Sequence, residues 1–317
     1  MSMGKRYLGA SDLEVSTIGL GCNSFGTKLD QASVCDVVHF ALDSGINFFD
    51  TANIYGSDGQ SEILLGKTVS RRRSEAILAT KVGMPMYPDK PYPNNSRKEI
   101  IREVEGSLRR LGTSWIDLYQ LHYPDTKTPI EETLRAMEDL VQQGKVRYIG
   151  CSNFSSTQLI EAMQTARSQK SSPFVACQTE YNFFSRECEE TLIPTAQQLG
   201  VGIIPYFPLA TGMLSGTIVP GRPLPSQSRL AKDPVIRNRF WTQSNQKLLA
   251  ALFSMAQKTA RGVPDLALAW LLSRSGVSTV IVGASRVSQV RQNIAAASHA
   301  LSKKEISLLT SLLLATR

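Results

Sequence analysis

The sequence predicts an α/β protein that forms a (β/α)8 barrel, and three observations support this fold class. Eight short apolar runs are each followed by a stretch whose apolar residues recur at helical spacing. Several of the runs are apolar throughout, as are strands that are buried on both faces. No point divides the pattern of the 317 residues into two halves, so we expect one domain over residues 1–317. A doubly wound sheet is the alternative fold.

The predicted strands and helices alternate along the chain. The strands are expected at residues 17–20, 47–50, 76–80, 116–121, 146–150, 175–178, 202–206 and 279–282. The clearest helical stripes cover residues 34–42, 101–111, 130–141 and 248–256. Start and stop signals flank three of these stripes: Asp30 and Gly45, Ser96 and Gly112, Pro129 and Gly144.

Three additions to the barrel are predicted. Residues 5–15 resemble a hairpin with its turn at residues 9–12, and we expect it to close the bottom of the barrel. Residues 207–243 contain five prolines and predict a long loop, which in a compact domain is usually functional or disordered. The end of the chain, residues 302–314, predicts an added helix.

Composition excludes several classes of protein. No stretch approaches the roughly 20 apolar residues of a membrane helix, and the first residues lack a signal peptide, so we expect a cytoplasmic protein without membrane contact. The net charge is +8, but the cations are scattered, which argues against nucleic-acid binding and leaves room for a phosphate-bearing cofactor. The five cysteines are odd in number and widely spaced, which predicts reduced thiols and no metal site. They are Cys22, Cys35, Cys151, Cys177 and Cys188.

Two short motifs resemble nucleotide-binding loops and fail on inspection. Residues 19–24 begin as a G-x-G-x-x-G motif but end in Ser24, and no Rossmann unit follows them. Residues 66–68 resemble the end of a phosphate loop, but they lie at the end of a predicted helix. The chain also has no G-x-S-x-G and no H-E-x-x-H motif, so hydrolase and metalloenzyme chemistry have no motif support.

Four polar side chains are expected at one rim of the barrel, where the carboxyl ends of the strands meet. Asp50 ends the second predicted strand and Tyr55 follows it, while Lys81 and His122 end the third and fourth strands. Asp50 can neutralise a buried Lys81, and a lysine cation lowers the pKa of a nearby tyrosine from about 10. Tyr55 would then donate a proton while His122 orients a carbonyl oxygen. None of the four can supply a hydride, so a cofactor is required.

These residues lie within motifs that resemble those of the aldo-keto reductases over almost the whole chain. The matching segments are residues 19–21, 50–56, 79–81, 118–122 and 150–154. The chain is more similar to the branch that includes perakine reductases and potassium-channel β subunits than to the aldose reductases. The resemblance implies NADPH-dependent, metal-free reduction of an aldehyde or ketone, with Tyr55, Lys81, Asp50 and His122 in the roles given above.

The resemblance also implies cofactor contacts. The nicotinamide would be held by Ser152, Asn153 and Gln178, with Tyr206 stacked on its ring, and Phe207, Pro208, Leu209 and Gly212 would follow the pyrophosphate. The adenosine end would lie at Gly283, Ser285, Arg286, Gln289, Gln292 and Asn293, with Arg286 suited to a 2′-phosphate. Further contacts are expected from Gly21, Cys22, Asn23, Asp50 and Arg229.

Two positions bear on how far the resemblance extends. The family branch usually carries a lysine that meets cofactor phosphate where this chain has Thr217, and Arg222 or Arg229 is the candidate replacement. The channel subunits carry another residue at the position of His122, so this histidine favours an active reductase. A nicotinamide-binding regulatory subunit and a barrel of unrelated activity, such as a lyase, are the alternatives.

The substrate is expected to be a small or medium carbonyl compound bound between loops. These loops contain Phe25 and Thr27, residues 84–92, 123–127 and 213–240. Aromatic residues suggest an apolar wall: Tyr87, Tyr92, Tyr123, Phe240 and Trp241. We expect a monomer, with a homodimer as the alternative.

Overall fold

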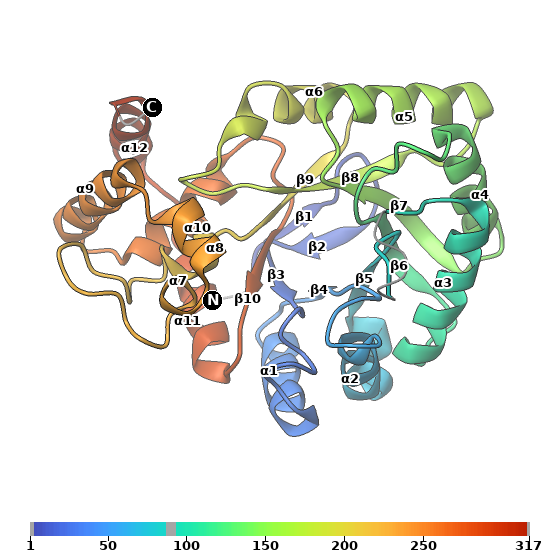
Figure 1. Ribbon diagram of the computed structural model, residues 1–317, viewed down its shortest axis with the longest axis horizontal. Coiled ribbons are helices and arrows are strands. Elements are labelled where there is room, and N and C mark those ends of the chain that lie inside the picture. Colours follow the sequence, from blue (N-terminus) through green and yellow to red (C-terminus); the bar gives the residue numbers. More distant parts are fainter. Residues whose placement is uncertain (1–2, 87–92, 316–317) are drawn as a thin grey trace.

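The computed structural model describes residues 3–86 and 93–315, and eight parallel strands form its centre (Figure 1). In sheet order they are β10 (Val280–Gly283), β3 (Ile18–Gly21), β4 (Phe48–Asp50), β5 (Ile77–Val82), β6 (Ile116–Leu121), β7 (Val146–Ser152), β8 (Phe174–Glu180) and β9 (Gly202–Tyr206). β9 pairs with the segment that leads into β10, where Ile203 N donates to Gly276 O at 2.8 Å and Ile203 O accepts from Ser278 N at 3.0 Å. The sheet therefore closes into a (β/α)8 barrel, and the doubly wound alternative is wrong.

Helices surround the strands (Figure 1). They are α1 (Gln31–Asp43), α2 (Gln60–Val69), α3 (Arg97–Leu111), α4 (Ile130–Gln142), α5 (Ser156–Gln169), α6 (Leu192–Gln198), α7 (Arg229–Lys232), α8 (Pro234–Phe240), α9 (Gln243–Thr259), α10 (Val263–Ser273), α11 (Val287–Ala297) and α12 (Lys303–Ala315). Asp30 caps α1 as expected, because its side chain accepts from Ser33 N at 2.9 Å. Gly112 ends α3 in the left-handed conformation, which a residue with a side chain adopts at a cost.

The predicted hairpin closes the lower end of the barrel. Its strands are β1 (Lys5–Tyr7) and β2 (Glu14–Ser16), which pair antiparallel. Leu8, Leu13 and Val15 are buried in an inner core cluster with Phe48 and Leu118, whose strands β4 and β6 belong to the barrel. Because Phe48 is the first residue of its strand, the hairpin lies at the end of the barrel opposite to the carboxyl ends of the strands.

Residues 207–243 contain more structure than the loop that was expected. They include a 3-10 turn, η3 (Ala210–Gly212), and the short helices α7 and α8. Asp233 caps α8 by accepting from Val235 N and Ile236 N, and Pro234 occupies the first helical turn. Helices of four and seven residues are too short to show a periodic apolar pattern. The five prolines therefore favoured the prediction of a loop.

Two findings concern the described part of the chain as a whole. Within it, no helix combines the length and the apolar character needed to cross a bilayer. All five cysteines are unpaired thiols, and four of them are buried.

Candidate functional site

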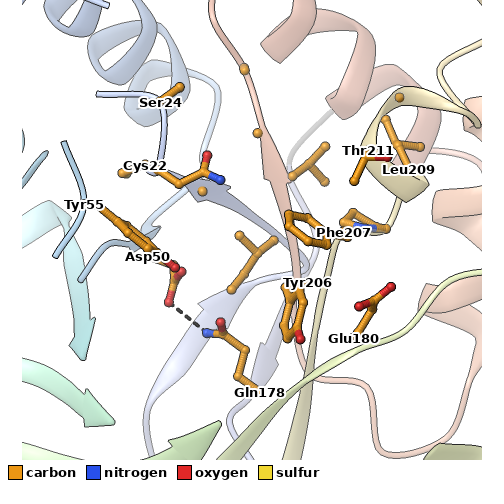
Figure 2. A pocket seen from close by; sticks show the side chains of 18 of the residues that line it. Cys22, Ser24, Asp50, Tyr55, Gln178, Glu180, Tyr206, Phe207, Leu209 and Thr211 are labelled. Atoms are coloured by element: carbon orange, nitrogen blue, oxygen red, sulfur yellow. Dashed lines mark hydrogen bonds between the residues drawn. The ribbon is translucent and has the colours of Figure 1, made fainter. Parts of the chain in front are cut away.

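A cavity of about 570 Å³ opens at the carboxyl ends of the barrel strands (Figure 2). Six strands each contribute their last residue to its lining: Gly21, Asp50, Ser152, Glu180, Tyr206 and Gly283. His122, which follows β6 directly, lines the cavity as well. The rim expected to carry the chemistry is therefore the rim that holds the cavity.

Lys81 and Asp50 form a buried ion pair at the floor of this cavity. Lys81 Nζ donates to Asp50 Oδ2 at 2.7 Å and to the Thr51 carbonyl at 2.9 Å. The other carboxylate oxygen, Oδ1, accepts from Gln178 Nε2 at 2.9 Å (Figure 2) and from Gln120 Nε2 at 3.3 Å. Both charges are thus hydrogen-bonded, which makes their burial tolerable.

Burial alone would lower the pKa of the Lys81 ammonium, but the charges and hydrogen bonds of Asp50 and Tyr55 raise it above its ordinary value. Lys81 therefore remains a cation, and its Nζ lies 3.5 Å from Tyr55 Oη. Burial raises the pKa of the Tyr55 hydroxyl more than the Lys81 charge lowers it. The expected net lowering of this pKa is wrong in this structure, and Tyr55 keeps its proton at neutral pH.

His122 is a neutral imidazole beside Tyr55. Burial and the nearby Lys81 charge lower the pKa of His122 to about 3. Its ring lies 5.8 Å from the Tyr55 ring, nearly perpendicular to it, and stacks on Tyr123 at 5.5 Å. Its Nδ1 is buried and has no hydrogen-bond partner among the described residues. A neutral ring can offer one N–H to a carbonyl oxygen without adding a charge.

Asn153 connects three strand ends around the cavity. Its Nδ2 donates to His122 O at 3.0 Å and to Ser152 Oγ at 3.1 Å, and its Oδ1 accepts from Tyr206 Oη at 2.8 Å. The backbone of Asn153 is left-handed, with φ of 62°, a conformation that asparagine adopts more readily than most residues. The contacts fix the orientations of an amide and an aromatic ring that both face the cavity.

Most residues expected to contact a cofactor line this cavity. They are Gly21, Cys22, Asn23, Asp50, Ser152, Asn153, Gln178, Tyr206, Phe207, Pro208, Leu209, Gly212, Arg229, Gly283, Ser285 and Gln289. Figure 2 shows Tyr206 and Gln178 from adjacent strands facing the same space as Asp50 and Tyr55. The structure therefore gathers into one cavity residues that lie more than 250 positions apart in the chain.

Three of the expected cofactor residues do not line the cavity. Arg286 caps α11 and is exposed, and its Nε donates to Ser288 Oγ at 3.0 Å. Gln292 is exposed on α11, whereas Asn293 is buried in the same helix. Their positions at the start of α11 and on its other faces direct these side chains away from the cavity. The spacing of residues along the sequence does not show this direction. Of the two candidates to replace the missing lysine, Arg229 lines the cavity and Arg222 does not.

Several residues that line the cavity were not expected from the sequence: Ser24, Lys28, Glu180, Thr211, Ile281 and Val282. Ser215 and Arg239 also line it, and both lie in residues 213–240, which were expected to border the substrate pocket. Lys28 and Ser24 follow the first barrel strand, so the rule about strand ends would have found them. Arg239 lies in α8, a helix that the sequence did not predict within this expected loop.

The expected aromatic wall is only partly formed. Tyr123 lines the cavity, but Phe240 is buried in the hydrophobic core and Trp241 packs against that core. Phe25, which was expected in a substrate loop, is buried in the same core. These rings serve packing, because apolar side chains in short helices and loops bury themselves wherever the core is adjacent. Tyr87 and Tyr92 lie outside the described residues.

Comparison with known proteins identifies the class to which this fold and site belong. The model of the aldo/keto reductase family matches residues 17–314, so the chain belongs to this family of oxidoreductases, which act on carbonyl compounds. It is 36% identical over 318 residues to an uncharacterized oxidoreductase, YrpG, of Bacillus subtilis (strain 168), covering 96% of this chain and 94% of that protein. It is 35% identical over 302 residues to a probable voltage-gated potassium channel subunit beta of Arabidopsis thaliana, covering 92% and 90%.

Proposed function

We propose that the protein reduces aldehydes or ketones to alcohols, with NADPH as its cofactor. One observation carries the proposal: the Lys81 ammonium contacts both the Asp50 carboxylate and the Tyr55 hydroxyl at the floor of a cavity. A structural ion pair would need only the first contact. The second couples a proton-carrying hydroxyl to a fixed positive charge, as general acid catalysis requires.

The proton path follows from these contacts. A bound reduced nicotinamide supplies the hydride that the protein side chains cannot provide. As the carbonyl oxygen gains negative charge, Tyr55 donates its proton to that oxygen, and Lys81 stabilises the resulting phenolate at 3.5 Å. His122 donates a hydrogen bond to the same oxygen. General acid catalysis of this kind contributes about 10²–10⁴-fold to a rate.

The residues around the cavity suit a nicotinamide dinucleotide. The amides of Gln178 and Asn153 can pair with a carboxamide, and the Tyr206 ring offers a flat apolar face beside them. The cavity volume of about 570 Å³ lies within the usual range for ligand sites. Ser285 and Gln289 line the cavity at the start of α11, where we place the adenosine end.

The test is NADPH oxidation at 340 nm against a panel of aldehydes, ketones and quinones, repeated with NADH. We expect turnover of several carbonyl compounds and faster turnover with NADPH. Tyr55→Phe should abolish turnover and leave NADPH binding, measured by titration calorimetry, unchanged. Absence of turnover across the whole panel would exclude the reductase, and normal turnover by Tyr55→Phe would exclude this role for Tyr55.

A regulatory subunit is the second candidate function. It is favoured by the 35% identity to a protein described as a probable potassium channel subunit beta. Such a subunit would bind the dinucleotide and turn over every substrate slowly. A pull-down that recovers a stable membrane-protein partner, together with slow turnover on the full panel, would favour this candidate over the reductase.

A further inference from the structure

The loop that carries Tyr55 is left-handed over four successive residues. Residues 56–59 have φ of 74°, 45°, 51° and 74°, and two of them, Ser57 and Asp58, are not glycines. Left-handed backbone at a residue with a side chain stores strain, and it persists only where the surrounding structure holds it. Tyr55 Oη also lies 3.5 Å from Lys81 Nζ, at the outer limit of a hydrogen bond. A small displacement of the loop would therefore separate the hydroxyl from its cation.

Asn53 holds the first half of this loop by two contacts. Its backbone nitrogen donates to Lys81 O at 3.3 Å, and its side chain is completely buried. The side-chain Nδ2 donates to Glu103 Oε2 at 2.9 Å, whereas Oδ1 has no hydrogen-bond partner among the described residues. Within residues 3–86 and 93–315, the orientation of the Asn53 amide is thus fixed by the Glu103 carboxylate alone.

Glu103 is an expensive residue at its position in the helix. It is 6% exposed, and α3 buries it together with Ile100 and Val104. Its Oε1 accepts from Arg102 Nε at 3.1 Å, and its Oε2 accepts from Asn53. A buried carboxylate costs free energy, and an apolar side chain would fill the same space without that cost. The contact with Asn53 is the task that an apolar side chain cannot perform.

Glu99, one helical turn earlier on α3, separates this task from burial itself. It is 7% exposed, and its Oε1 accepts from Arg102 Nη2 at 2.5 Å, so it has the burial and the cation of Glu103. Among the described residues, however, only Glu103 accepts a hydrogen bond from the Asn53 side chain. The two carboxylates therefore differ in their contact with the loop of Tyr55 and resemble each other in charge and burial.

We propose that Glu103 is a positioning residue for the proton donor. Through Asn53 it fixes the loop after β4, and that loop places Tyr55 Oη beside Lys81 Nζ. Neither Glu103 nor Asn53 lines the cavity, so both act without touching a ligand. Misplacement of a reacting group by 1 Å can cost about 10²-fold in rate, so an anchor behind the cavity has a large effect. The role rests on the proposed function, since it requires that Tyr55 donates the proton.

The experiment measures kcat and KM for carbonyl reduction, and the Kd of NADPH by titration calorimetry, for the full chain and its variants. The probe is the panel member that the wild type reduces fastest, with 4-nitrobenzaldehyde as the first choice. Glu103→Leu leaves the Asn53 amide without its anchor, so we expect kcat to fall about tenfold. The KM and the Kd of NADPH should stay within about twofold of the wild type, because the cavity lining is unchanged.

Glu99→Leu is the matched control. It removes an equally buried carboxylate from the same helix and from the same arginine, and it leaves the contact between Glu103 and Asn53 in place. Its kcat should stay within about twofold of the wild type. Both variants should lose a similar amount of stability in urea unfolding, so lost stability alone cannot produce a difference in kcat.

Two further variants test the contact itself. Asn53→Ala should reproduce the loss of kcat, and adding Glu103→Leu to it should lower kcat no further, because the two residues act through one contact. Glu103→Gln should keep kcat within about threefold of the wild type, because its amide oxygen can still accept from Asn53 Nδ2. Amide hydrogen exchange over residues 51–59 should be faster in Glu103→Leu than in Glu99→Leu.

Each remaining outcome counts against one of the two proposals. An active wild type with equal kcat in Glu103→Leu and Glu99→Leu would overturn the positioning role alone. Should Glu103→Leu not fold, Asn53→Ala decides, and a kcat equal to that of the wild type would overturn the role. Absence of turnover by the wild type across the whole panel would overturn the proposed function together with it.

Discussion

Two ion pairs stand at the same cavity with nearly the same N–O distance and in very different surroundings. Lys81 and Asp50 are 2.7 Å apart with side chains that are 0% and 5% exposed, whereas Arg239 and Glu180 are 2.6 Å apart and 54% and 13% exposed. Water screens the second pair much more than the first, of which only the Asp50 edge borders the cavity. Distance alone therefore says little about what each pair contributes, and burial decides it.

The largest effect is expected when the buried pair is broken. Lys81→Met leaves the Asp50 carboxylate buried without its counter-charge, which should lower the free energy of unfolding by about 3–5 kcal/mol. Urea unfolding followed by circular dichroism measures this loss. The double variant Lys81→Met/Asp50→Asn should recover a large part of it, because it removes both charges. A loss below about 1 kcal/mol in the single variant would show that water solvates this pair.

An intermediate effect on the free energy of unfolding is expected when the pH is lowered, because His122 is buried in the site. In the folded protein the pKa of His122 is lowered from 6.5 to about 3. Below pH 6.5 the unfolded chain therefore binds a proton at this residue that the folded protein does not bind. Stability from this group is complete above pH 6.5 and is lost as pH falls, by about 2 kcal/mol at pH 5. Between pH 7 and 5, the stability of His122→Gln, measured by thermal unfolding, should fall less steeply than that of the wild type. Parallel declines would place the His122 pKa near its ordinary value.

The smallest effect is expected when the exposed pair is broken. Arg239→Met should change the free energy of unfolding by less than about 1 kcal/mol, because water replaces the guanidinium at Glu180, which keeps its hydrogen bond from Ser185 Oγ. Added salt should reduce even this difference. The measurement is urea unfolding at low and at high ionic strength. A loss comparable to that of Lys81→Met would mean that burial does not separate the two pairs.

The same contrast explains which parts of the molecule the sequence could predict. The barrel strands were anticipated because buried parallel strands are apolar throughout, and 116–121 and 202–206 match β6 and β9 at both ends. Asp50, Tyr55, Lys81 and His122 were brought together by one rule, that strand ends meet at one rim. Backbone hydrogen bonding fixes such positions, so the spacing of residues is enough to find them.

Other features depend on side-chain direction and solvation, which spacing does not encode. Lys28 reaches the cavity and Arg286 does not, although both follow a barrel strand. The net direction of the Tyr55 pKa depends on burial outweighing the Lys81 charge, a balance set by the surrounding atoms. The helices of residues 207–243 are too short for a periodic signal, so α7 and α8 could not be predicted although residues 213–240 were expected at the substrate pocket.

The hairpin at the lower end of the barrel has a consequence for how the chain folds during synthesis. Arg6 Nη1 donates to Val277 O at 2.7 Å and Nη2 donates to Leu272 O at 2.8 Å, across separations of 271 and 266 residues. On the ribosome, the hairpin therefore emerges long before its partners exist, and Leu8 and Leu13 remain without the last strand that completes their surroundings. Such long-range contacts favour slow, late closure of the barrel, during which these apolar side chains are available to chaperones.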